Sequence, residues 1–284
     1  MATVQATGPT PAGAEPEVPA AGRAKAGPVK EFLEEMGELC VFSARALRAV
    51  PGSTRYFSEI LRLNAQIIRR SSFILLAMSV FLGFSVATFG FFFLRTIGGG
   101  DFVGVFTGLL TQRQTSSTMY GYVLSASICC SMTAVIGAAK IQQEIDAYAS
   151  TGTDPMQFIV GTRVLAAMLF VPLGTVIALI GQNLGNFLDI VVVLQGNSAR
   201  QFLDVTFSVQ SVTGQLYALV TFGFMTLPCV LVACFYGMNA SGGPADVGRA
   251  VAKSLMINLV LVHVIAAFFG VFFYGRNLNI PIGG

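Results

Sequence analysis

The acidic residues of one short polar segment are the side chains of this sequence best placed to do chemistry. Glu144 and Asp146 lie in KIQQEIDAYASTGTDPMQFIVGTR, residues 140–163, between two runs without any charge. Two carboxylates that converge on one substrate can work as an acid and a base. Residues two apart on a helix diverge instead, because neighbours on one face are three or four positions apart. The pair is therefore not arranged for catalysis on one substrate.

Other arrangements that support catalysis or cofactor binding are not found in the sequence. His263 is the single histidine, so a Ser-His-Asp triad cannot be argued and a cluster of histidine metal ligands is excluded. The glycine-rich stretch SGGPADVG at residues 241–248 lacks the Lys that a phosphate-binding G-x-x-x-x-G-K-[ST] loop needs. We therefore expect a non-catalytic chain that itself binds no cofactor, metal or nucleic acid.

The acidic pair requires an element to position it, and the spacing predicts a helix of about three turns over residues 140–151. Its apolar stripe, at positions i, i+4 and i+7, consists of Ile141, Ile145 and Tyr148. Gly152 is suited to end this helix, and Asp154-Pro155 to begin the next one. Such a helix lies across a membrane face. From the pattern alone, docking of a partner and simple capping of the bundle explain it equally well.

The composition indicates a membrane protein. The chain has 284 residues, of which 54% are hydrophobic and 11% charged, whereas an average soluble domain is roughly 25% charged. A helix needs about 20 apolar residues to cross the hydrocarbon. The predicted spans are residues 71–94, 114–139, 164–188, 215–236 and 254–275. The predicted fold class is thus an all-α integral membrane protein with five transmembrane helices, and none of the five contains Asp, Glu, Lys or Arg.

The segments outside the spans are expected to be peripheral. Residues 1–28 are rich in Pro, Ala and Gly and are predicted to be a disordered cytoplasmic tail. Residues 29–70 are predicted to be amphipathic interfacial helices, broken at Pro51-Gly52. Residues 102–112 are apolar but too short to cross, which predicts a surface or re-entrant piece. Three amide side chains near the end of the third span are expected to face the aqueous boundary: Gln182, Asn183 and Asn186.

The basic residues predict the orientation. Of 17 Lys and Arg residues, Arg95, Arg113, Arg200 and Arg276 fall on one side of the predicted spans, and the other thirteen fall on the opposite side with the N-terminus. Loops rich in Lys and Arg stay in the cytoplasm. The N-terminus and the segment 140–163 are therefore predicted to be cytoplasmic, and the C-terminus to be outside.

Two runs of the sequence carry a family resemblance. GAAKIQQEIDAYASTGTDPMQFIVGTRVLAAMLFVPL closely resembles the signature of the MlaE/YrbE permeases, the membrane subunits of Mce (mammalian cell entry) lipid ABC transporters. YGMNASGGPADVGRAVAKSL resembles the second cytoplasmic signature of this family, and RYFSEILRL resembles a run of its actinobacterial branch. Val135 stands where the family pattern has an acidic residue. The matching positions of the first signature are Glu144, Ile145, Asp146, Ala147, Gly152, Asp154, Pro155 and Arg163.

The resemblance implies an MlaE-like permease fold over residues 71–284, in the bacterial plasma (inner) membrane. It implies transport of lipids or other hydrophobic substrates between MCE-domain proteins outside and the membrane or cytoplasm. A second permease subunit, either a paralogue or another copy, would complete the pathway, and a separate cytoplasmic ABC ATPase, in two copies, would hold ATP and Mg.

The resemblance also implies that the helix at 140–151 is the coupling helix on which the ATPase docks. Glu144 and Asp146 would pair with basic residues of the ATPase, and Ile145 and Tyr148 would be the apolar anchor. Gly152, Asp154 and Pro155 belong to the same signature.

Transport itself gives weaker signals. Candidate substrate-pathway residues in the first and fifth spans are Phe81, Phe84, Phe89, Asn258 and His263. Contact of the phenylalanines with membrane lipids, and hydrogen bonds between helices for Asn258 and His263, explain the same residues. Two other functions remain open, an ATP-independent transporter or channel and a non-transporting membrane scaffold.

Overall fold

The structure is a computed structural model that describes residues 28–275 of the 284-residue chain. The chain divides into two compact units, residues 1–38 and 39–284. In the first unit the described residues begin helix α1 (Pro28–Ser53), whose exposed Lys30 and Glu34 form an ion pair of 3.8 Å. The predicted tail, residues 1–28, lies outside the described residues except for Pro28.

Five helical segments in the described part of the chain are long and apolar enough to cross a membrane. They are Leu33–Thr96, Gly100–Ile141, Met156–Val193, Val212–Met238 and Pro244–Tyr274. No β-strand occurs among the described residues. The prediction of an all-α membrane protein with five spans is thereby confirmed.

The first span is longer than its apolar core. Helix α1 includes Pro51 and ends at Ser53, a 3-10 turn follows at Thr54–Tyr56, and α2 then runs without interruption from Phe57 to Thr96. The helix therefore continues through Pro51-Gly52, and the predicted break comes two residues later, at the turn that begins with Thr54. The second predicted interfacial helix and the first span form one helix, because no helix-breaking residue separates them.

The second span is a chain of α- and π-helical pieces. After a 3-10 turn (Gly100–Phe102) come α3 (Val103–Leu110), η3 (Thr111–Thr115), α4 (Ser116–Val123), η4 (Leu124–Cys129) and α5 (Cys130–Ile141); η3 and η4 are π-helical. Residues 102–112 are thus not the separate surface or re-entrant piece that was predicted. They lead directly into the second span, and the glycines of α3 allow it to pack closely on α8.

The third span begins after the short helix α6 (Glu144–Ser150). It comprises η5 (Met156–Gly161), α7 (Thr162–Phe187) and η6 (Leu188–Val193), with η5 and η6 again π-helical. The sequence did not predict α8 (Ala199–Val209), although Ser198 caps it by accepting a hydrogen bond of 3.3 Å from the Gln201 amide. The last two spans are α9 (Val212–Met238), which contains Pro228, and α10 (Pro244–Tyr274).

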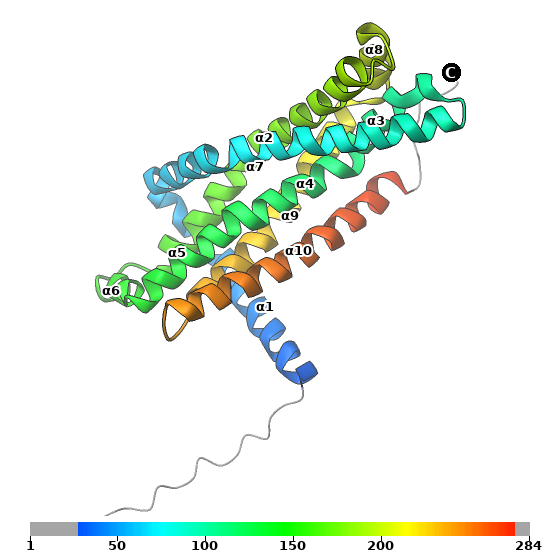
Figure 1. Ribbon diagram of the computed structural model, residues 1–284. Coiled ribbons are helices and arrows are strands. Elements are labelled where there is room, and N and C mark those ends of the chain that lie inside the picture. Colours follow the sequence, from blue (N-terminus) through cyan, green and yellow to red (C-terminus); the bar gives the residue numbers. More distant parts are fainter. Residues whose placement is uncertain (1–27, 276–284) are drawn as a thin grey trace, which may run out of the picture. The chain divides into compact units, whose positions relative to one another are not determined.

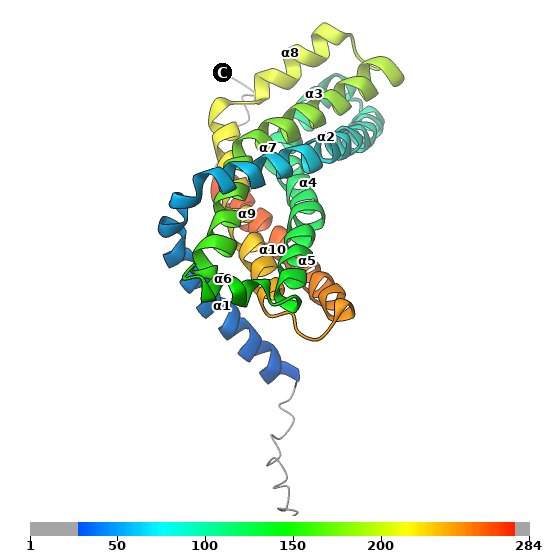
Figure 2. The same ribbon diagram turned by 90° about the vertical axis from the view of Figure 1, so that its left-hand side faces the viewer.

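Helices α2 and α7 lie side by side along much of their length (Figures 1 and 2). Glycines make this close approach feasible. A Cβ atom at Gly83 would collide with the carbonyl oxygen of Gln182, and one at Gly185 with the carbonyl oxygen of Val80. Helix α9 is the most buried of the five spans.

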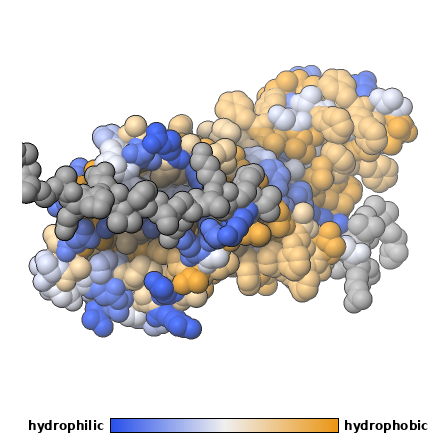
Figure 3. Space-filling model, turned by 90° about the horizontal axis from the view of Figure 1, so that it is seen from below, coloured by the Kyte–Doolittle hydropathy of each residue, from blue (hydrophilic) through white to orange (hydrophobic). Residues whose placement is uncertain are grey.

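Large apolar side chains cover much of the outer surface of the bundle. Figure 3 shows hydrophobic residues over a large part of the face that it presents. Exposed examples on α2 and α10 include Phe73, Phe81, Val271 and Phe272. A continuous apolar surface of this kind is stable in lipid and unfavourable in water.

A buried polar layer lies at the end of the bundle opposite α6. Gln182 donates a hydrogen bond to Thr115, and Asn186 Nδ2 donates to Thr111 Oγ1 at 2.9 Å. Both amides are fully buried, so the prediction that they face the aqueous boundary is wrong. Residues four apart share one helix face, and this face of α7 packs on the start of the second span. The third amide, Asn183, is half-buried.

Candidate functional site

The segment between the second and third spans contains a shorter helix than predicted. The second span ends at Ile141, Gln142 and Gln143 form a turn, and α6 then covers Glu144–Ser150, about two turns. Gln143 has φ 59°, in the left-handed region, which breaks the helix between Ile141 and Glu144. Residues 140–151 are therefore two helices that meet at a corner.

The end of α6 has the geometry expected from the sequence. Gly152 has φ 78°. The Thr153 amide donates to the Tyr148 carbonyl at 3.1 Å, and the Gly152 amide donates to the Ala149 carbonyl at 3.1 Å. This pair of bonds is the Schellman motif, in which glycine adopts a conformation that other residues rarely tolerate. The prediction that Gly152 ends the helix is confirmed.

Asp154 and Pro155 start the third span as predicted. Asp154 Oδ1 accepts a hydrogen bond of 2.9 Å from the Met156 amide, and the Asp154 carbonyl accepts from the Phe158 amide at 3.0 Å. Pro155 lacks an amide hydrogen, which is no loss in the first turn of a helix. This turn fixes how the chain leaves α6 and enters η5.

Apolar and aromatic contacts hold α6 on the bundle. Ile145 is 3% exposed and belongs to the main core. Tyr148, 38% exposed, contacts the Phe158 ring at 5.1 Å between ring centres, and Phe158 in turn contacts Tyr56 at 5.1 Å. The three rings connect α6 with the start of the third span and with the turn that precedes α2. Because Ile145 is buried within this chain, the surface available to a partner lies on the other residues of α6.

Most of the exposed residues of α6 are acidic or small. Glu144, Asp146, Ala147, Ala149 and Ser150 are all exposed. Asp146 Oδ1 is 3.1 Å from Nζ of Lys140, at the end of α5. Glu144 forms no ion pair with the described residues of the chain, which makes it the carboxylate best placed to meet a basic partner.

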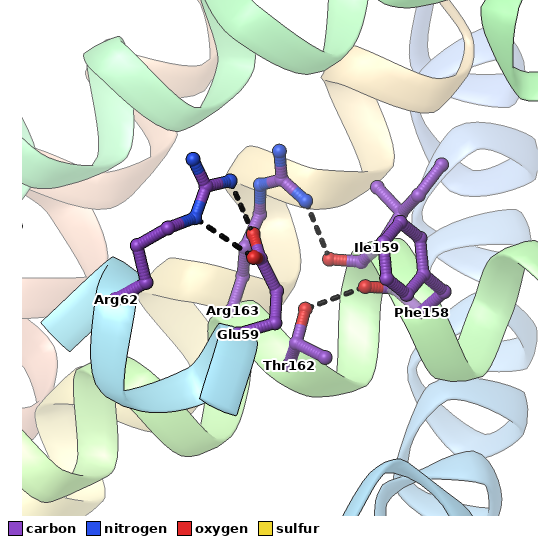
Figure 4. Close-up of polar contacts among 6 residues, drawn as sticks. All are labelled: Glu59, Arg62, Phe158, Ile159, Thr162 and Arg163. Carbon is purple, nitrogen blue, oxygen red and sulfur yellow. Dashed lines mark hydrogen bonds and ion pairs between the residues drawn. The ribbon is translucent and has the colours of Figure 1, made fainter. Parts of the chain in front are cut away.

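A group of charged side chains lies beside η5 at this end of the bundle. Figure 4 shows Arg163 of α7 next to Glu59 and Arg62 of α2. Arg62 donates to both oxygens of Glu59, at 2.8 and 2.6 Å, and Arg163 Nη1 donates to the Ile159 carbonyl at 2.9 Å. In addition, Ser53 Oγ donates to the Gln157 carbonyl at 2.8 Å. The segment that follows α6 is thus hydrogen-bonded to the end of α1, and Arg163 lies beside the charged pair of α2.

The loop between α9 and α10, which carries the second signature, lies at the same end as α6 (Figures 1 and 2). Gly242 has φ 93°, and the Gly243 amide donates to Asp246 Oδ2 at 3.0 Å, which caps α10. A Cβ atom at Gly137 of α5 would lie 3.3 Å from that of Ala240. The loop therefore packs on α5 close to α6.

The predicted substrate-pathway phenylalanines lie on the outer side of α2. Phe84 and Phe89 line a groove of about 650 Å³, together with Ser85, Thr88, Phe92, Phe93 and Thr96. Phe81 is exposed and does not line this groove.

The two predicted pathway residues of the fifth span make hydrogen bonds between helices. Asn258 is fully buried, and its Nδ2 donates to the Cys229 carbonyl of α9 at 3.2 Å. His263 Nε2 is 2.9 Å from the Tyr122 hydroxyl of α4, and its ring is exposed. The structure does not bring either residue together with the phenylalanines of α2 in one cavity.

A charged residue inside a span was missed in the sequence. The third span continues through η6 to Val193, so Asp189, which follows the predicted end at residue 188, is helical and only 1% exposed. Its Oδ2 accepts a hydrogen bond of 2.8 Å from Thr88 Oγ1 of α2. The apolar run LDIVVVL continues past the aspartate, and this was the signal that the span is longer.

Comparisons with known proteins identify the family of this chain. A family model described as permease MlaE matches residues 60–272. Probable ABC transporter permease proteins of Rickettsia typhi and Rickettsia bellii are 23% and 24% identical over 239 and 234 residues, which is 82% of this chain and 90% of each relative. A third such protein, from Rickettsia conorii, is 23% identical over 235 residues, with the same coverage. The chain therefore belongs to the MlaE permease family, as a multi-pass ABC transporter permease of the bacterial plasma membrane.

Proposed function

We propose that this permease moves lipids or other hydrophobic substrates and is driven by a separate ATPase that docks on α6. The observation that carries the proposal is the construction of this helix. Its acidic residues are exposed, while Ile145 and the Tyr148–Phe158–Tyr56 contacts hold the helix on the spans. A force on α6 is therefore transmitted to the membrane helices.

The chemistry of the docking surface indicates a basic partner. Glu144 is available for a charge pair, and Asp146 shares its charge with Lys140. Charge pairs at an interface select the partner and accelerate association. ATP and Mg would be held by the ATPase, because the glycine-rich stretch 241–248 of this chain lacks the lysine of a phosphate-binding loop. The ATPase would thus lie on the α6 side, which the distribution of basic residues predicts to be cytoplasmic.

The remaining partners follow from the resemblance to Mce-type permeases. MCE-domain proteins on the outer side would exchange hydrophobic substrates with the membrane or cytoplasm through this subunit. A second permease subunit, a paralogue or a second copy, would complete the pathway, and two ATPase copies would serve the pair. The apolar groove that Phe84 and Phe89 line is a surface that such substrates can contact.

The test is a charge reversal on α6. We expect Glu144→Lys to weaken co-purification of the ATPase at least about tenfold, since a lysine would face basic residues of the partner. The matched control is Asp204→Lys on α8, another exposed acidic helix residue. It should leave ATPase recruitment and lipid uptake unchanged. Normal recruitment and uptake by Glu144→Lys would contradict the docking role and favour a scaffold.

The ATP-independent alternative has one supporting observation, the buried carboxylate of Asp189. Ion-coupled transporters carry charged residues within their spans. Transport in liposomes that continues without ATP and stops when an ionophore is added would favour that alternative. Transport that requires the ATPase and hydrolysable ATP would favour the proposal.

A further inference from the structure

A cavity in the α6 half of the bundle has no part in the docking just described. It has a volume of about 140 Å³ and lies between α2, the η4–α5 stretch and the start of α7. Two arginines, Arg70 and Arg163, line it, and none of the residues that line it is acidic. The cavity therefore carries positive charge without a carboxylate of its own.

The two guanidinium groups retain donors for a further ligand. Arg70 Nη1 donates to Ser131 Oγ at 3.3 Å, and Arg163 Nη1 donates to the Ile159 carbonyl at 2.9 Å. These are their only hydrogen bonds within residues 28–275, whereas each group has five N–H donors. Glu59, drawn beside Arg163 in Figure 4, has both oxygens held by Arg62.

The rest of the lining is divided into a polar and an apolar part. Ser71 and Ser127 share a hydrogen bond of 3.0 Å near Arg70. Ile67, Met132 and Val135 form part of the apolar side, and Val135 is 51% exposed on the outer surface of the bundle. This lining suits a ligand with an anionic group and an apolar tail. The anionic group would contact the polar side, and the tail would extend out of the cavity beside Val135.

The position of the cavity along the bundle indicates that such a ligand is a membrane lipid. Arg70 directly precedes the charge-free run that starts at Ser71, and Arg163 directly precedes the one that starts at Val164. Arginines at the ends of spans lie at the height of the lipid headgroups. The cavity is small and opens on the surface of the bundle, which suits a headgroup whose chains lie outside it.

We propose that this cavity binds the anionic headgroup, a phosphate or a carboxylate, of a membrane lipid whose chains pass Val135 and lie along the surface of the bundle. Arginine suits this role because its planar group can bind such an anion through two parallel hydrogen bonds. The proposal needs only that the chain lies in a bilayer and does not depend on ATPase docking.

The experiment uses the full-length chain in detergent, equilibrated with equal amounts of phosphatidylglycerol and phosphatidylcholine. Native mass spectrometry measures the lipids that remain bound. We expect a preference of at least about tenfold for the anionic lipid, and its loss in Arg70→Gln/Arg163→Gln, because hydrogen bonds to a charged group are removed. Val135→Glu should abolish the preference as well, because its carboxylate would occupy the arginines.

The matched control is Arg69→Gln. Arg69 is exposed and adjacent to Arg70 but does not line the cavity, so its replacement should leave the preference unchanged. Because Arg163 also holds the Ile159 carbonyl, thermal unfolding is measured for each variant. If Arg70→Gln/Arg163→Gln does not fold, Arg70→Gln and Val135→Glu decide the question.

Three results would overturn the proposal. Equal binding of the two lipids would exclude a site for an anion. An equal loss in Arg69→Gln and Arg70→Gln would indicate general surface charge. Displacement of phosphatidylglycerol by inorganic phosphate at equal concentration would indicate a site for a free anion instead of a lipid.

Discussion

Single residues determine where α6 begins and ends. Only some of these residues can be predicted from the sequence. Gly152 was predicted to end the helix, because glycine at this position is a common stop signal, and its φ of 78° confirms it. Gln143 also adopts a left-handed conformation, but a glutamine gives no such signal. The corner between α5 and α6 therefore could not be predicted, and the two helices were expected to be one.

Asp189 gives the sharpest test at the residue scale. It is buried and accepts a hydrogen bond from Thr88, an arrangement that links the third span to α2. In an ATP-driven permease this role is structural, so Asp189→Asn, which preserves shape and a polar contact, should transport within about twofold of the unaltered protein. The measurement is ATP-dependent lipid transport in liposomes, with and without an ionophore.

A different outcome would change the assignment of Asp189. Loss of transport in Asp189→Asn, with normal folding and ATPase binding, would mean that the charge itself is used.

At the scale of elements, the composition of the sequence predicts the membrane-spanning helices. It does not predict how these helices contact one another. Five charge-free runs predicted five helices, and each is present in the described part of the chain. The ends were misplaced where helix continues beyond the apolar run, as in α2, α10 and η6. Helix α8 was not predicted, because the uncharged run 205–245 begins within this helix and contains no charged residue to mark its end at Val209. The backbone N–H and C=O groups of a helix are paired within the helix, so polar residues can continue a helix beyond its apolar run.

The close contact of α2 and α7 predicts a large difference between two glycines. At Gly185 a methyl group would collide with the Val80 carbonyl, whereas at Gly248 of α10 nothing lies within 4 Å. We expect Gly185→Ala to lower the free energy of unfolding by about 1–3 kcal/mol, because the helices must move apart. Gly248→Ala should be neutral, or stabilising by up to about 1 kcal/mol.

Thermal unfolding of the two alanine variants in the same detergent measures this difference. Equal melting temperatures for Gly185→Ala and Gly248→Ala would show that α2 and α7 do not pack so closely at Gly185 that a methyl group is excluded.

At the scale of the whole bundle, unit 39–284 places both signature segments at one end (Figure 1). A buried polar layer lies at the other end. The sequence predicted the first of these features, because two loops separated by an even number of spans must lie on the same side. It did not predict the second. Gln182 and Asn186 lie near the end of the predicted third span, where polar residues commonly face water. Their burial depends on packing against another helix, which the sequence does not show.

The aromatic contacts from α6 to the turn that precedes α2 predict that docking and coupling can be separated. Phe158 lies between Tyr148 and Tyr56 and is not on the exposed side of α6. We expect Phe158→Leu, which retains an apolar side chain and removes both ring contacts, to bind the ATPase normally. Lipid stimulation of ATP hydrolysis should fall at least about threefold, given that each ring pair contributes 0.5–1.5 kcal/mol.

The control for this prediction is Phe268→Leu, on the exposed side of α10. Unchanged stimulation in Phe158→Leu, or an equal decrease in Phe268→Leu, would show that the coupling takes another route.

The burial of Ile145 makes the joint between α6 and the spans respond differently to opposite loads. A motor that presses on α6 drives this side chain further into a packed core, which resists compression. A motor that pulls must expose it to water, at a cost of about 1.5–3 kcal/mol, before the spans move at all. If an ATPase docks on α6, we therefore expect the contact to be stiff when α6 is pushed towards the bilayer and to yield when α6 is pulled away from it.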